Sequence, residues 1–165
     1  MKNIVFAAVF TLILAGCGSG LKHHMALNDK DGFDTIYDPA LKELKIANWN
    51  EPYILFFFTT MCGACTAQVP VLNELVKEYG SKIKVIGVMG NSLGFDGDMM
   101  ALKDKGVEFM SVSTKKSVDY FSNIVGGIMG TPVTYVFDKN GKISKQFLGL
   151  YPKSALENEL KLLLN

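Results

Sequence analysis

The chain has 165 residues, about the size of one domain. It is 48% apolar and 20% charged, which is typical of a globular protein and not of a disordered one. The 17 basic residues are all lysine, and against 16 acidic residues they give a net charge of +1. Because the chain has no basic block and no arginine, its composition argues against nucleic-acid binding and excludes bidentate arginine sites for phosphate or carboxylate.

Residues 1–16 have the features of a signal peptide. Lys2 precedes an apolar run over residues 4–14, which is too short to span a bilayer comfortably. The run ends in Leu-Ala-Gly-Cys at positions 14–17, which resembles the lipobox of bacterial lipoproteins. In that family the lipid is attached to the cysteine and cleavage occurs just before it, so the resemblance implies a mature chain that begins at a lipidated Cys17. An ordinary secretory signal, with Cys17 incidental, is the alternative.

The lipobox implies a domain anchored to a bacterial membrane on its periplasmic or extracytoplasmic side. Gly18, rather than aspartate, follows the cysteine, a pattern that resembles outer-membrane sorting in Gram-negative lipoproteins. Residues 17–31 show little periodicity and are predicted to form a flexible tether, which leaves residues 32–165 for the folded domain. His23 and His24 in the tether are expected to be solvated, with metal binding as the alternative.

Within the folded part, an apolar run over residues 53–58 predicts a strand buried on both faces. The amphipathic pattern of residues 62–79 predicts a helix that ends at Gly80, and residues 83–89 predict a second strand, which completes a βαβ unit with parallel strands. Three further helices are expected over residues 38–45, 98–105 and 117–125, and a short strand over 109–112.

The last part of the chain carries a strong hairpin signal. Asn140-Gly141 lies between apolar runs at residues 134–138 and 143–148, so these two strands are predicted to be antiparallel. A final amphipathic helix over residues 153–164 is expected to cover one face of the sheet. These elements predict an α/β fold with a central mixed sheet flanked by helices.

Cys62-Gly63-Ala64-Cys65 falls where a buried strand ends and a helix begins. The free N–H groups and the positive end of the helix dipole favour an anion at this point, so a cysteine there is more readily a thiolate and a better nucleophile. One helical turn brings Cys65 beneath Cys62, within reach of a disulfide. The sequence therefore predicts a redox pair in which Cys62 is the exposed nucleophile and Cys65 its shielded partner.

Two other interpretations of the cysteine pair are open. A structural disulfide is possible, but a bond that closes so small a loop constrains the unfolded chain weakly. A zinc site needs about four ligands, and the other candidates all lie in the predicted tether. No metal and no organic cofactor is expected.

Residues 56–65, with the sequence Phe-Phe-Phe-Thr-Thr-Met-Cys-Gly-Ala-Cys, resemble the active-site strand and helix of the thioredoxin superfamily. Pro70 matches the proline that kinks that helix. Gly130-Thr131-Pro132 resembles the family's cis-proline loop, in which the proline packs against the disulfide and the preceding residue pairs through its backbone with the substrate. The resemblance implies a cis bond before Pro132, where a trans proline that opens an edge strand is the alternative.

The resemblance covers residues 37–164 and implies a thioredoxin fold with an extra helix between the CxxC helix and the cis-proline loop. With its predicted anchor, the chain is most similar to the TlpA/ResA group. Members of that group reduce disulfides outside the cytoplasm, often during cytochrome c maturation. The resemblance implies Thr131, Pro132 and Met61 as substrate-binding residues. Protein disulfides, those of apocytochrome c among them, would be the substrates, and a membrane thiol carrier would supply electrons.

The sequence departs from the family pattern at three positions. Met61 stands where tryptophan is usual, Phe56 replaces the buried carboxylate of thioredoxins, and Gln68 replaces the glutamate of ResA-like proteins. Because an amide does not titrate, the sequence leaves the proton acceptor for Cys65 unassigned. A disulfide donor or isomerase of the same fold, or a non-catalytic lipoprotein with a structural disulfide, are the alternative functions.

Overall fold

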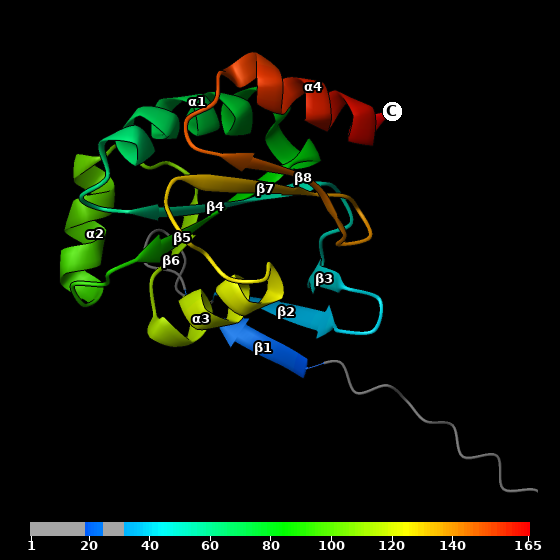
Figure 1. Ribbon diagram of the computed structural model, residues 1–165, viewed down its shortest axis with the longest axis horizontal. Helices are drawn as coiled ribbons and strands as arrows, with labels where there is room; N and C mark the ends of the chain where they lie inside the picture. Colours follow the sequence, from blue (N-terminus) through cyan, green and yellow to red (C-terminus); the bar gives the residue numbers. More distant parts are fainter. Residues whose placement is uncertain (1–18, 25–31) are drawn as a thin grey trace, which may run out of the picture.

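The computed structural model describes residues 19–24 and 32–165 (Figure 1). The signal peptide, Cys17 and Gly18 lie outside the described residues. Five strands form the central sheet: β4 (Tyr53–Thr59), β5 (Lys84–Gly90), β6 (Met110–Val112), β7 (Val133–Phe137) and β8 (Ile143–Leu148). Their order is β6-β5-β4-β7-β8, with β4, β5 and β6 parallel and with β7 antiparallel to both β4 and β8. This is the mixed sheet that the sequence predicts.

Helices cover both faces of the sheet (Figure 1). The helices are α1 (Gly63–Tyr79), α2 (Phe95–Asp104), α3 (Lys115–Ile124) and α4 (Lys153–Leu164), with a short 3-10 turn, η1 (Gly80–Lys82), after α1. In Figure 1, α1 and α4 lie above the sheet and α3 lies below it. Both α2 and α3 fall between α1 and the loop before β7, so the extra helix of the prediction is present.

Strand β4 is the centre of two hydrophobic cores. Ile54, Phe56 and Phe58 point into the core shared with α1 and α4, whereas alternate residues such as Leu55 and Phe57 point into the core on the α3 side. A strand that is apolar at every position, as the sequence shows, is what burial on both faces requires. The β4–α1 junction is thereby fixed at the carboxyl edge of the sheet.

A second, three-stranded antiparallel sheet contains β1 (Ser19–His23), β2 (Phe33–Asp38) and β3 (Glu43–Ile46) in the order β1-β2-β3. The prediction of a tether through residue 31 is therefore wrong for residues 19–23, which pair with β2 along five residues. His23 is fully buried, so the expectation of a solvated side chain is also wrong. Its imidazole binds hydroxyl groups of β2 and α3. These partners are distant in the chain, so local sequence patterns do not reveal them.

The helix expected over residues 38–45 is also absent, and the chain forms a turn followed by β3. Asp38 does cap backbone N–H groups, because its carboxylate accepts from Ala40 and Leu41 at 2.9 and 3.1 Å. The same local bonds begin a turn as well as a helix. The chain reverses there because Leu44 and Ile46, which alternate in β3, are buried in the core on the α3 side.

Candidate active site

The CxxC motif lies where the sequence predicts it, at the junction of β4 and α1. Cys62 is the N-cap residue of α1, with φ −95° and ψ 110°, and its Sγ accepts a hydrogen bond from the Cys65 backbone N–H at 3.1 Å. The two cysteines form a disulfide with Cα atoms 5.1 Å apart. The Cys65 N–H of the first turn therefore points at the sulfur of Cys62, and together with the positive end of the helix dipole it favours a thiolate once the bond is reduced.

The two sulfur atoms differ in exposure. Cys62 is partly exposed, whereas Cys65 is fully buried against the core of α1 and α4. A nucleophile has to reach its substrate and a resolving thiol has to be shielded from it, so this contrast agrees with the roles expected for the two residues. The structure places Met61 beside them with its side chain almost fully exposed.

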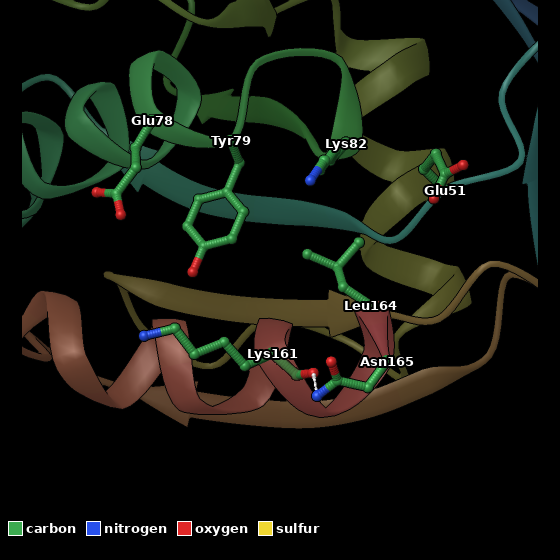
Figure 2. Close-up of a pocket in the computed structure, with 7 residues that line it drawn as sticks. All are labelled: Glu51, Glu78, Tyr79, Lys82, Lys161, Leu164 and Asn165. Carbon is green, nitrogen blue, oxygen red and sulfur yellow. Dashed lines mark hydrogen bonds between the residues drawn. The ribbon is translucent and has the colours of Figure 1, made fainter.

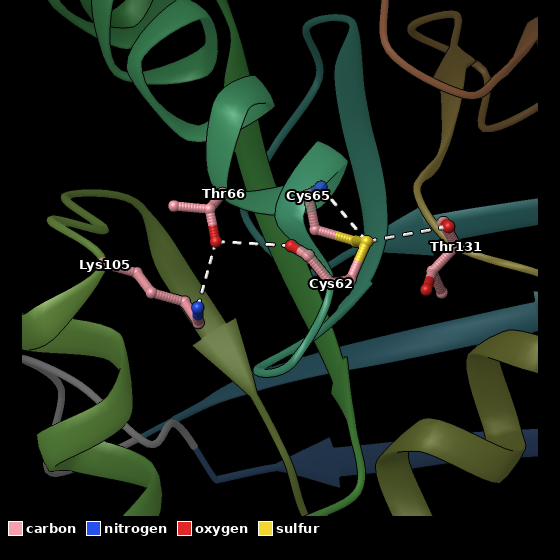
Figure 3. The surroundings of a disulfide bond; sticks show 5 residues. All are labelled: Cys62, Cys65, Thr66, Lys105 and Thr131. Carbon is pink, nitrogen blue, oxygen red and sulfur yellow. Dashed lines mark hydrogen bonds between the residues drawn. A yellow bond between two sulfur atoms is a disulfide. The ribbon is translucent and has the colours of Figure 1, made fainter.

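The loop before β7 faces the disulfide. The Thr131–Pro132 peptide bond is cis, as the resemblance implies. The carbonyl oxygen of Thr131 lies 3.7 Å from Cys62 Sγ, although 69 residues separate the two positions in the chain (Figure 3). Met129 in the same loop is fully exposed. The structure thus brings Cys62, Cys65, Thr131 and Pro132 together.

An apolar cavity of about 360 Å³ lies next to this loop. The ends of β4 and β5, one face of α3 and the loop itself line it, with contributions from Thr59, Gly90, Val118, Met129 and Thr131 among others. The described residues that line it are all uncharged. The part that α3 contributes could not be predicted from the sequence, because no local pattern shows that Val118 lies near the cis-proline loop.

Two positions that hold carboxylates in related proteins hold other groups here. Phe56 is fully buried and stacks on Phe58 with ring centroids 5.1 Å apart. Gln68 is buried, and its amide bonds to the Tyr151 backbone in both directions, at 3.1 Å to the carbonyl oxygen and 2.8 Å from the N–H. Neither residue can accept the proton of Cys65 as a carboxylate would.

The sequence does not predict a role for Lys105, but the structure places its side chain at the CxxC turn. Its Nζ donates to Thr66 Oγ1 at 2.9 Å, and the Thr66 hydroxyl donates to the Cys62 carbonyl oxygen at 3.3 Å (Figure 3). The only sequence signal for this contact is a lysine at the end of the helix expected over residues 98–105.

A larger cavity, of about 550 Å³, lies at the other end of α1, where that helix ends close to α4 (Figure 2). Its lining is polar and of mixed charge, with Glu78, Lys82 and Lys161 among the residues. It lies about 25 Å along α1 from the disulfide, since each helical residue adds about 1.5 Å. It is therefore separate from the redox chemistry.

Within residues 19–24 and 32–165, no group of three or more His, Cys, Asp or Glu side chains is arranged to hold a metal ion. None of the helices in these residues combines the length and the hydropathy of a membrane span.

The Redoxin family model matches residues 33–160, which is most of the chain. The thiol-disulfide oxidoreductase ResA of Bacillus thuringiensis (strain Al Hakam) is 31% identical over 171 residues, covering 97% of this chain and 96% of that protein. The chain belongs to the Redoxin family. As a Redoxin-family protein with a CxxC disulfide and close similarity to ResA, it is a thioredoxin-like thiol-disulfide oxidoreductase.

Solved structures confirm the thioredoxin fold of this Redoxin-family chain. A putative thiol:disulfide interchange protein DsbE from Chlorobium tepidum has a TM-score of 0.64 and 21% identity, covering 87% of this chain and 98% of that one. StoA from Bacillus subtilis has a TM-score of 0.63 and 16% identity, covering 86% of this chain and 96% of that one. At these identities the likeness concerns the fold.

Proposed function

We propose that this oxidoreductase reduces protein disulfides outside the cytoplasm, with Cys62 as the nucleophile and Cys65 as the resolving cysteine. The observation that carries the proposal is the contrast between a partly exposed Cys62 at the helix N-terminus and a fully buried Cys65. The resemblance to the TlpA/ResA group supports reduction as the direction of the reaction.

The reaction runs in two exchange steps. The Cys62 thiolate attacks one sulfur of a substrate disulfide, which forms a mixed disulfide and releases the other substrate sulfur as a thiolate. The thiolate of Cys65 then attacks Cys62 Sγ, which forms the Cys62–Cys65 disulfide and releases the second substrate thiolate. Two electrons pass to the substrate, whose thiolates take up protons. An external dithiol, proposed to be a membrane thiol carrier, returns the pair to its reduced state.

Substrate binding is proposed for Thr131, Pro132 and Met61. The carbonyl of Thr131 lies beside Cys62, so an extended substrate segment that pairs with the backbone of this loop has its cysteine next to the nucleophile. Met61 offers a flexible apolar contact at the rim. The apolar cavity beside the loop has room for one substrate side chain, and apocytochrome c is proposed as one substrate.

The anchor is proposed to be a lipid on Cys17 that holds the protein to a bacterial membrane. The Gly18 pattern favours the outer membrane. Strand β1 begins at Ser19, two residues after Cys17 in the sequence. Replacement of Cys17 by alanine should release the protein from membranes into the soluble fraction. Continued membrane association of Cys17→Ala would refute the lipid anchor.

Two measurements test the enzymatic proposal. Cys62→Ser should abolish reduction of insulin disulfides, whereas Cys65→Ser should accumulate mixed disulfides with the substrate, because the resolving step is lost. The reduction potential of the pair tests the direction. A value near that of thioredoxin, about −270 mV, supports a reductase, and a value near that of DsbA, about −120 mV, would instead make the protein a disulfide donor.

A further inference from the structure

The Lys105 side chain connects α2 to the first turn of α1. Lys105 directly follows α2 and is partly buried, and its ammonium group donates to Thr66 Oγ1 at 2.9 Å. The Thr66 hydroxyl in turn donates to the carbonyl oxygen of Cys62 at 3.3 Å, and the Thr66 backbone N–H reaches the same oxygen at 3.1 Å. Figure 3 shows the resulting chain of hydrogen bonds from the ammonium group to the nucleophilic cysteine.

Among the described residues, the groups of other elements that bond to the CxxC turn are uncharged, apart from Lys105. The cis-proline loop presents the Thr131 carbonyl oxygen. In β4, Phe56 stands at the position where thioredoxins have a buried carboxylate. Gln68 of α1 is occupied by the Tyr151 backbone. Among the residues that the structure describes, no carboxylate is hydrogen-bonded or ion-paired to Cys62, Cys65 or Thr66, and Lys105 is the one charged side chain bonded to this turn.

We propose that Lys105 is a positioning residue of the redox site, whose ammonium group holds the first turn of α1 through Thr66 and favours the thiolate form of Cys62. A hydroxyl partner leaves the lysine charge unneutralised, so its field adds to that of the helix N-terminus. The charge stabilises the reduced, thiolate-bearing protein relative to the disulfide. Lys105 therefore makes the pair a stronger oxidant than the bare CxxC helix would be.

This inference rests on the thiol–disulfide chemistry of the pair and not on the direction of electron flow. The test uses the full chain in its reduced form, with two readouts: the thiolate absorbance as a function of pH, and the equilibrium constant with glutathione. In Lys105→Met the thiolate transition should move to higher pH. The equilibrium should shift roughly two- to fivefold toward the protein disulfide, the size expected for one charge acting through a partly solvated site.

Three variants serve as controls. Lys105→Arg keeps the charge and a donor for Thr66, and should behave as the wild type in both readouts. Lys103→Met removes the same charge from an exposed position two residues earlier and should leave both readouts unchanged. Thr66→Val keeps the charge but removes the bridge, and should reproduce part of the Lys105→Met shift.

The proposal is overturned if Lys105→Met lowers the free energy of unfolding but leaves both redox readouts at the wild-type values, because Lys105 would then be only structural. An equal shift in Lys103→Met, or no shift in Thr66→Val, would overturn it as well. Failure of the proposed reductase function looks different. In that case the wild-type potential lies near that of DsbA while the shift caused by Lys105→Met remains.

Discussion

Gln68 binds the backbone of Tyr151 with both ends of its amide, 83 residues away in the chain. The carbonyl end accepts and the NH₂ end donates, a pair of bonds that an ionised carboxylate cannot make because it has no donor. According to the family resemblance, ResA-like proteins have a glutamate at this position, which helps to move the proton of the second thiol. Here the residue instead holds the segment between β8 and α4 against α1.

The glutamate can be restored to test this reading. In Gln68→Glu, the protonated carboxyl can still donate to the Tyr151 carbonyl oxygen, whereas the ionised form faces that oxygen without a proton. Burial and this contact raise the folded-state pKa of the new carboxyl above the usual 4.3, so stability is retained below about pH 4 and is lost as pH rises. At pH 7 we expect a loss of about 1–3 kcal/mol, measured by urea unfolding.

The control for this prediction is Gln68→Leu, which removes both hydrogen bonds but introduces no titratable group. Its loss of stability should not depend on pH beyond the dependence of the wild type. If Gln68→Glu also gives a loss that is constant between pH 4 and 7, the proposed contact between the carboxyl and the Tyr151 carbonyl is wrong.

At the scale of elements, His23 attaches strand β1 to the rest of the domain. Its Nδ1 lies 2.9 Å from Ser117 Oγ of α3 and its Nε2 lies 2.8 Å from Thr35 Oγ1 of β2. The imidazole also stacks on Phe121, with ring centroids 4.5 Å apart. Both partners are uncharged hydroxyl groups in an apolar core, so this environment favours the neutral form of the imidazole over the charged form.

Burial lowers the pKa of His23 to about 4, an effect that Asp34 opposes and that Lys116 and His24 reinforce. The unfolded chain binds a proton near the ordinary value of 6.5, so stability is highest above that pH and falls as pH drops from 6.5 to 4. This difference corresponds to a loss of up to about 3 kcal/mol. In His23→Gln the loss between pH 6.5 and 4 should be smaller than in the wild type by this amount.

The matched control is His24→Gln, because His24 is exposed and neighbours His23 in the chain. Urea unfolding across the same pH range should give nearly the wild-type dependence for this variant, because His24 is the smallest of the contributions to the low pKa of His23. An identical pH dependence in His23→Gln and the wild type would show that His23 is not held neutral in the folded protein.

For the molecule as a whole, the folded domain includes β1, so it extends at least to residue 19 and does not begin at residue 32. Strand β1 pairs with β2 along its length, and β2 and β3 place Phe33, Leu44 and Ile46 in the core on the α3 side. A chain of residues 19–165 should melt at the same temperature as the mature protein. A chain of residues 32–165 should melt several degrees lower, because Thr35 and Ser117 lose their buried partner.

Calorimetry of the two truncated chains checks this boundary. Equal melting temperatures would mean that β1 contributes nothing to the fold and that the tether does extend to residue 31. The Cys62–Cys65 potential of the longer chain serves as the control, since it should equal that of the untruncated protein.

Local physics in the sequence determined the central part of this protein. The unbroken apolar run of β4, the helix that begins at the CxxC motif and the Asn-Gly hairpin are each specified by neighbouring residues, and with the family resemblance they predicted the fold, the disulfide and the cis-proline loop. The tertiary structure alone decided what depends on distant partners. The polar segment of residues 19–23 forms β1, where His23 bonds to Ser117. The Asp38 turn leads into a strand because Leu44 is buried in the core on the α3 side. Lys105 reaches the redox site because the end of α2 lies next to the first turn of α1. Contacts between residues tens of positions apart leave no periodicity or local motif, so only the folded chain reveals them.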